Sequence, residues 1–223
     1  MLRFIQLSIP VLAMTMTGIA CASQGPSTPQ TTWFSPGPVA NGPLLRGKSP
    51  FDCRIDSVRS WVMAGSAPDH YHIARVNALA WLAEDSCRTG WRIESTQQTR
   101  ESDFAVVPYS FSAQHYQGKR IRYSAVLQTE GVTGGAGLVA RVDDANGKVL
   151  AFDDMRTRAL IGTVQDTRYD VVLEVPESAS TIMVGLVLVG NGTVSANKLR
   201  IEAVGADVPV TDTLSSVTQS TTK

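Results

Sequence analysis

The chain has 223 residues and a formal net charge of zero, with 20 basic and 20 acidic side chains. This balance excludes the strongly basic surface with which proteins bind nucleic acid by releasing counterions, so we expect no nucleic-acid partner. Charged residues make up only 18% of the chain, which is typical of an exported β protein with one domain and extensions.

The N-terminal segment, residues 1–22, predicts a secretory signal peptide, because one Arg precedes an uncharged run from Phe4 to Ala20. A membrane anchor is the alternative, but it needs about 20 apolar residues, and polar side chains interrupt this run. The sequence Gly18-Ile19-Ala20-Cys21 resembles a bacterial lipobox and predicts lipidation of Cys21. Cleavage after Ala22 at a site of the Ala-x-Ala type is the competing interpretation.

The segments that flank the expected domain have their own signatures. Residues 23–50 are dense in Pro, Gly, Ser and Thr without an apolar period, which predicts an extended linker. Residues 206–223 are polar and predict a disordered tail. The expected domain therefore spans residues 51–205. Cys53 and Cys87 lie in it and predict one disulfide in an oxidising compartment, with two separate buried thiols as the alternative.

Short segments with apolar alternation follow one another from about residue 51, separated by turn residues. Residues 66–72 are expected to form a loop, and residues 76–85 a short helix or an irregular connection. Pro108 favours an edge or a bulge for its strand. The predicted strands are 59–65, 89–95, 103–113, 119–130, two strands within 137–155, 167–176, 180–190 and 193–204.

Residues 119–130 give the clearest strand pattern. Ile121, Tyr123, Ala125 and Leu127 are expected on one face, and the intervening residues from Arg120 to Val126 on the other. Residues 137–155 predict a hairpin, because Asn146-Gly147 is the favoured pair where both turn residues need positive φ. In this hairpin, Leu138, Ala140 and Val142 alternate with Val139, Arg141 and Asp143. The glycine-rich residues 133–137 predict a flexible loop at the end of a sandwich.

Many short strands with at most one short helix predict an all-β fold, an antiparallel jelly-roll β-sandwich. Four aromatic residues in strand patterns are expected in its core: Trp61, Trp91, Tyr123 and Tyr169.

Several motifs between Ile55 and Val204 resemble a jelly-roll domain found in bacterial exported and regulatory proteins. That domain is similar to carbohydrate-binding modules of the galactose-binding-like class. The resemblance implies the fold and a glycan-binding role. We expect no catalytic activity, because the sequence shows no nucleophile–base or paired-carboxylate arrangement. The matching residues are Trp61 to Tyr71; Tyr116, Gly118, Lys119 and Arg120; Phe152, Asp153 and Met155; and Arg168, Tyr169 and Pro176.

The resemblance directs attention to a sheet face and its adjoining loops as the binding region. Candidate ligand-binding residues are Tyr71, Tyr109, Tyr116, Arg122, Arg141 and Asp153. Where relatives carry tryptophans, which stack on sugar rings, this chain has Val139 and Asp166-Thr167. The alternative function is therefore a structural or protein-interaction module of the bacterial envelope.

Metal and catalytic sites are weaker hypotheses, and we expect no cofactor. The resemblance implies a structural calcium as one role for Asp143, Asp144, Asp153 and Asp154; solvation of turns is the other. Adjacent residues on a strand point to opposite faces, so Asp153 and Asp154 are not expected to flank one glycosidic bond. A metal site at His70 and His72 lacks readable further ligands, and His115 is isolated.

The sequence therefore predicts an exported, non-catalytic binding module. Its expected location is the periplasm, or the outer membrane through a lipid anchor, of a Gram-negative bacterium. Its expected partner is a glycan, such as a cell-wall polysaccharide, or an envelope protein. Contact with the membrane is expected only through that anchor.

Overall fold

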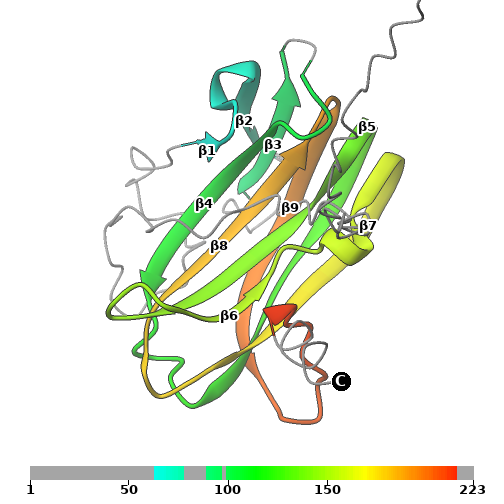
Figure 1. Ribbon diagram of the computed structural model, residues 1–223. Helices are drawn as coiled ribbons and strands as arrows, with labels where there is room; N and C mark the ends of the chain where they lie inside the picture. Colours follow the sequence, from blue (N-terminus) through cyan, green and yellow to red (C-terminus); the bar gives the residue numbers. More distant parts are fainter. Residues whose placement is uncertain (1–62, 78–88, 97–98, 215–223) are drawn as a thin grey trace, which may run out of the picture. The chain divides into compact units, whose positions relative to one another are not determined.

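A computed structural model describes residues 63–77, 89–96 and 99–214 (Figure 1). The chain divides into two units, Met1–Gln30 and Thr31–Lys223, and all described residues belong to the second. The predicted signal peptide, the linker and both cysteines of the predicted disulfide, Cys53 and Cys87, lie outside the described residues. Within those residues, we find no helix with the length and apolar character needed to span a membrane.

The described elements are nine antiparallel strands and two short 3₁₀ turns. The 3₁₀ turns are η2 (Pro68–His70) and η3 (Arg156–Arg158). The strands are β1 (Ala64–Gly65), β2 (Tyr71–Asn77), β3 (Thr89–Ser95), β4 (Phe104–Ser112), β5 (Lys119–Asp144), β6 (Val149–Asp153), β7 (Leu160–Val175), β8 (Ala179–Val189) and β9 (Thr193–Val204).

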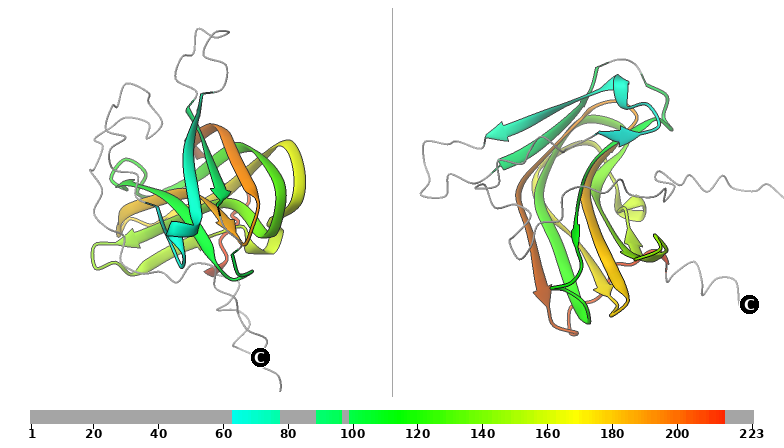
Figure 2. Two further views of the ribbon diagram at one scale, coloured as in Figure 1. Left: turned by 90° about the horizontal axis from the view of Figure 1, so that it is seen from above. Right: turned by 90° about the vertical axis from the view of Figure 1, so that its left-hand side faces the viewer.

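The sheet curls so that two layers face each other, and β5 belongs to both (Figure 2). The N-terminal half of β5 pairs with β7 and β9, and β3 and β2 continue this first layer. The C-terminal half of β5 pairs with β6 and β8, and β4 and β1 continue the second layer. The prediction of an all-β antiparallel sandwich is thus confirmed.

The core lies between the two layers and follows the predicted alternation. Ile121, Tyr123, Ala125 and Leu127 are all buried in it. Trp91 lies in the same cluster, and Tyr169 packs against it as a partly buried side chain. The fourth aromatic residue predicted for the core, Trp61, lies outside the described residues.

The predicted glycine-rich loop is instead part of a strand. Residues 133–137 lie inside β5, which runs for 26 residues without interruption. The pairing of β5 with β7 shifts register three times between Leu127 and Ala136, and these irregularities let the strand turn from the first layer into the second. Gly131 lies at one of these irregularities. Its φ of 59° is a backbone conformation that glycine adopts without the strain that other residues would have there.

The start of the described chain also differs from prediction. Within 59–65, the described strand comprises only Ala64–Gly65, which pair with Val106 and Ala105. The expected loop 66–72 contains η2, and β2 already begins at Tyr71. Most of the predicted helix 76–85 lies outside the described residues. Pro108, which favoured an edge or a bulge, lies in β4 beyond Val106, the last position that β1 pairs with among the described residues.

The second layer is apolar on its outer side as well as its inner side. Along β8, Ile182, Val184, Leu186 and Leu188 enter the core between the layers. The intervening positions contribute to a second cluster, which we call the outer apolar cluster. It consists of Val106, Val139, Phe152, Met183, Val187 and Val189. The side chains of residues 138–143 therefore alternate between the two sides of the sheet as predicted, but those on the outer side are buried rather than exposed.

The chain after Val204, predicted to be a disordered tail, is ordered as far as Leu214. The Arg120 guanidinium donates to the carbonyl oxygens of Ala206 and Val208. Farther on, Thr211 N donates to Val172 O and Thr213 N donates to Phe152 O, both at 2.8 Å. Because Val172 lies on β7 and Phe152 on β6, this strap of residues 206–214 joins edge strands of the two layers.

We expect Thr211→Pro to lower the free energy of unfolding by about 3 kcal/mol, because it removes three hydrogen bonds worth about 1 kcal/mol each. The lost bonds are those from Thr211 N to Val172 O, from Val172 N to Thr211 Oγ1 and from Thr211 Oγ1 to Val172 O. Thr211→Val removes only the two hydroxyl bonds and should have about two thirds of the effect. Urea unfolding checks both variants, and equal losses would show that the backbone bond contributes nothing.

Candidate binding face

The outer side of the first layer carries polar side chains from three neighbouring strands. Ser124 on β5 is paired with Asp170 on β7 and Arg200 on β9, and residues paired across strands project from the same face. The adjacent rows place Arg122 beside Glu202, and Val126 between Arg168 and Asn197. We call this surface the polar face: Arg122, Ser124, Arg168, Asp170, Asn197, Arg200 and Glu202.

One carboxylate on the polar face serves two guanidinium groups. Glu202 Oε1 lies 3.3 Å from Arg122 Nε, and Glu202 Oε2 lies 2.9 Å from Arg200 Nη2. The Arg200 side chain is 64% exposed, so most of its donors face solvent. A pair this exposed contributes little to stability, which leaves Arg200 available for a ligand.

Arg168 is held by a hydroxyl group rather than a carboxylate. Its Nη2 donates to Ser124 Oγ at 2.7 Å, and the Ser124 side chain is fully buried. Ser124 therefore orients an exposed guanidinium group without neutralising it. Asp170 is paired with Ser124 across β5 and β7, so the face carries both donors and acceptors.

Two buried polar atoms of this face have no hydrogen-bond partner in the described part of the chain: Arg122 Nε and Asn197 Oδ1. Arg122 Nε is within ion-pair distance of Glu202, but the contact lacks hydrogen-bond geometry. A buried polar group left without a partner costs about 1–3 kcal/mol. A ligand that supplied the missing partners would therefore gain affinity here.

The outward residues of β5, β7 and β9 in the first layer include no aromatic side chain, because Tyr123 and Tyr169 point into the core. The polar face therefore offers hydrogen bonds and charge, without a flat surface for stacking.

The six predicted ligand residues do not come together. Arg122 lies on the polar face. Tyr109 and Tyr116 are partly buried around Phe111, with ring centroids 6.1 Å and 5.8 Å from it. Burial raises the pKa of Tyr109 to about 12, so its hydroxyl stays protonated at physiological pH. Tyr71 is buried, and its hydroxyl lies 2.9 Å and 3.0 Å from the carbonyl oxygens of Asp103 and Gly190.

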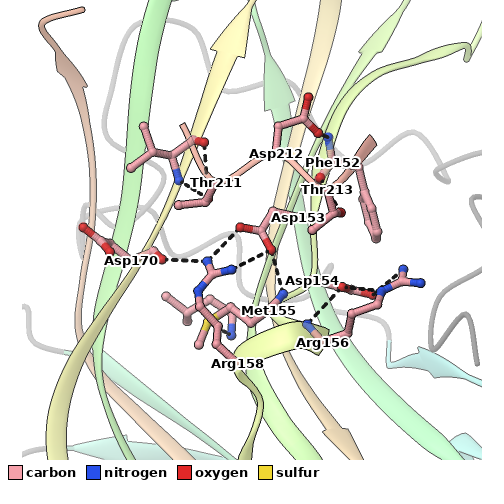
Figure 3. Close-up of polar contacts among 12 residues, drawn as sticks. Phe152, Asp153, Asp154, Met155, Arg156, Arg158, Asp170, Thr211, Asp212 and Thr213 are labelled. Atoms are coloured by element: carbon pink, nitrogen blue, oxygen red, sulfur yellow. Dashed lines mark hydrogen bonds and ion pairs between the residues drawn. The ribbon is translucent and has the colours of Figure 1, made fainter. Parts of the chain in front are cut away.

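Arg141 and Asp153 are internal residues rather than surface ones. Arg141 is 1% exposed, and its Nε lies 2.7 Å from Asp143 Oδ1. Asp153 is fully buried, and its Oδ2 lies 2.7 Å from Arg158 Nη2 (Figure 3). Both side chains are therefore buried and engaged in ion pairs of the domain, although the Arg158 side chain is 34% exposed.

The other two aspartates of the hairpin are also engaged. Asp144 Oδ1 accepts hydrogen bonds from the backbone amides of Asn146 and Lys148, and Asp154 pairs with Arg156 at 2.8 Å. Over the described ranges, no three His, Cys, Asp or Glu residues gather as metal ligands. His70 lies in η2, His72 in β2 and His115 in the connection between β4 and β5.

Comparison with known proteins gives one curated relative and several solved structures. No protein-family model matches the chain. The chain is 36% identical over 157 residues to an uncharacterized HTH-type transcriptional regulator, YbfP, of Bacillus subtilis; the match covers 70% of this chain. It covers 51% of the regulator, so the chain spans about half the length of that relative.

Carbohydrate-binding modules are among the similar solved structures. The CBM22-1 xylan-binding domain of Paenibacillus barcinonensis Xyn10C is 11% identical, with a TM-score of 0.41, covering 67% of this chain and 88% of that one. The C-terminal family 22 module of Clostridium thermocellum Xyn10B is 12% identical, with a TM-score of 0.42 and coverages of 73% and 96%. The enzymatically active domain of bacteriophage CBA120 tailspike protein 4 is 12% identical, with a TM-score of 0.47 and coverages of 70% and 21%.

Proposed function

We propose that the domain is a non-catalytic binding module that recognises a glycan on the polar face. The observation that carries the proposal is the set of incompletely paired groups there. Within the described chain, Arg168 is oriented by Ser124 and has no carboxylate partner, and Asn197 Oδ1 is a buried acceptor without a donor. These groups need a ligand that both donates and accepts hydrogen bonds, as the hydroxyl groups of sugars do.

The geometry of a strand suits an extended ligand. Successive outward residues of β5 are about 7 Å apart, so Arg122, Ser124 and Val126 span about 14 Å along the face. Guanidinium groups from β7 and β9 flank this line at Arg168 and Arg200. A polysaccharide laid along β5 would therefore meet donors on both sides.

Export and envelope anchoring form the second part of the proposal, and they rest on residues 1–22. The lipobox-like sequence ending at Cys21 motivates it. The mass of the mature protein purified from cells, with or without a diacylglycerol group, tests the anchor.

A protein-interaction module is the second candidate function. The observation that favours it is the lack of an aromatic platform among the described residues of the polar face, because charged and amide groups without a stacking surface also suit a protein partner. In either case the YbfP relative is a regulator named for an HTH motif, whereas the elements described here are strands and 3₁₀ turns. The shared segment is therefore proposed to bind ligands rather than DNA.

We expect Arg168→Ala and Arg200→Ala each to weaken glycan binding about tenfold, the equivalent of about 1.4 kcal/mol, because each removes charge-assisted hydrogen bonds. The probes are soluble cell-wall polysaccharides, measured by isothermal titration calorimetry. Arg100→Ala is the matched control, because that side chain is 86% exposed and lies between β3 and β4. Unchanged affinity in the Arg168→Ala/Arg200→Ala variant would reject the polar face. Co-purification of a defined protein without saturable sugar binding would select the second function.

A further inference from the structure

The polar face is bounded at one end by the strap of residues 206–214. The strap follows β9, and the guanidinium group of Arg120 on β5 donates to its carbonyl oxygens at Ala206 and Val208. Arg120 projects from the same side of β5 as Arg122, because alternate residues of a strand share a face. The first part of the strap is therefore held on the outer side of the first layer, next to the polar face.

The strap then reaches the edge of β7 that faces away from β5. Thr211 N donates to Val172 O at 2.8 Å, and Val172 N donates to Thr211 Oγ1 at 2.9 Å. Val172 is paired with Arg122 across β5 and β7, so its side chain lies on the outer side, yet it is only 2% exposed. The strap thus passes from β9 by way of Arg120 to the far side of β7, and the polar face ends there.

The exposure of the outward arginines increases with distance from the strap. The Arg120 side chain is 16% exposed, that of Arg122 is 33% exposed, and that of Arg200, one row farther on, is 64% exposed. Farther along β5, Gln128 and Glu130 are exposed as well. The polar face is therefore bounded at the Arg122 end and open to solvent at the other.

We infer that the polar face binds the end of a glycan chain rather than its interior. The inference rests on the proposed function, because it takes the polar face as the glycan site. A polysaccharide that lies along β5 meets the strap beyond Arg122, so its last bound sugar residue lies beside Arg122 and Glu202. A terminal residue has a free hydroxyl group where an interior residue has a glycosidic bond. The guanidinium and carboxylate groups at this end supply a donor and an acceptor for that hydroxyl group.

The binding stoichiometry of the full chain tests the inference, because end binding and interior binding depend differently on glycan length. The probes are peptidoglycan strands freed of their peptides and separated into a short and a long fraction, measured by isothermal titration calorimetry. We expect one protein molecule per glycan chain in both fractions. A number of bound molecules that rises in proportion to chain length would overturn the inference and leave the proposed glycan site intact. Absence of binding to both fractions would reject the proposed function, and the inference with it.

The two ends of a glycan chain both carry a free hydroxyl group, and chemical reduction distinguishes them. Borohydride opens the sugar ring at the reducing end and leaves the other end unchanged. A loss of affinity after this treatment would assign the reducing end to the site, whereas an unchanged affinity would assign the non-reducing end.

Two variants connect the preference for chain ends with the strap. Arg120→Ala removes the hydrogen bonds to Ala206 O and Val208 O, and it should at least double the number of protein molecules bound per long chain. Glu174→Ala is the matched control, because it removes the ion pair with Arg120 but leaves those bonds, and it should keep one molecule per chain. A folded Arg120→Ala variant that still binds one molecule per chain would overturn the strap as the boundary. If that variant does not fold, the stoichiometry of the wild-type protein decides the question.

Discussion

Arg158→Ala is expected to lower the free energy of unfolding by about 3 kcal/mol at pH 7, because it leaves a buried carboxylate without its cation. Asp153 is fully buried, and the two nitrogens of Arg158 lie 3.2 Å and 2.7 Å from its oxygens. Arg158 also donates to Asp170 O on β7 at 3.0 Å, so it links the end of β6 with an edge strand of the first layer. Urea unfolding monitored by tryptophan fluorescence measures the loss.

The same carboxylate fixes a tight turn. Asp153 Oδ1 accepts a hydrogen bond from Met155 N at 2.8 Å, and Met155 has a φ of 57° in the left-handed region. Met155 is fully buried, and Leu138 N lies 3.2 Å from its sulfur. Loss of the cation therefore strains the connection from β6 into η3, where Figure 3 shows the two aspartate–arginine pairs side by side.

A double-mutant cycle separates the charge from the shape of Asp153. Asp153→Asn keeps an acceptor for Met155 N but removes the charge, so Arg158→Ala should cost less in that background than in wild type. Arg92→Ala is the exposed control and should change stability by less than about 0.5 kcal/mol, because Arg92 and its partner Glu94 are 40% and 49% exposed. Additive losses in the double variant would contradict a role for the buried charge.

The strands that bury one face and expose the other could be predicted from the sequence. Residues 89–95 are β3 with the predicted bounds, and residues 103–113 differ from β4 by one residue at each end. In residues 89–95 apolar side chains recur with a period of two, which is the pattern of a half-buried strand, whereas residues 103–113 are a continuous apolar and aromatic run that becomes buried on both faces. The prediction of a loop at 133–137 was wrong because glycines also permit the bends that let one strand serve two layers.

Other features depended on contacts that no local pattern encodes. The burial of Val139 and Arg141 comes from the environment of the outer side, not from the alternation around them. The strap of residues 206–214 contains no apolar period, and its order comes from backbone groups on β6 and β7 together with Arg120. Local sequence thus predicted the direction of side chains better than their exposure.

The candidate site was predicted only in part for a related reason. Arg122 was identified because it lies on the polar side of a strongly alternating strand. Arg168 and Arg200 join it only through the pairing of β5 with β7 and β9. Such a register is set by the whole sheet, and a shift by one residue would move each side chain to the other face. The sequence signal that could have indicated Arg168 and Arg200 was the set of polar residues in the predicted strands 167–176 and 193–204.

The buried pair of Arg141 and Asp143 is expected to make stability depend on pH. Burial raises the pKa of Asp143 above its ordinary value of 3.8, and the Arg141 hydrogen bond and charge offset part of that rise. The folded protein then binds more protons at this carboxyl than the unfolded chain does. Its contribution to stability is fully present below pH 3.8 and is lost as the pH rises through the folded-state pKa.

Arg141→Met should enlarge this effect, because it keeps much of the side-chain volume but removes the groups that lower the pKa of Asp143. We expect a loss of about 3 kcal/mol at pH 7, because the substitution leaves a 4% exposed carboxyl group without its cation. The loss should shrink as the pH falls, because protonation of Asp143 removes the buried charge. Urea unfolding from pH 4 to pH 7 measures the trend. In an Asp143→Asn background the cost of Arg141→Met should no longer vary with pH, and a persistent pH dependence there would assign the effect to another carboxylate.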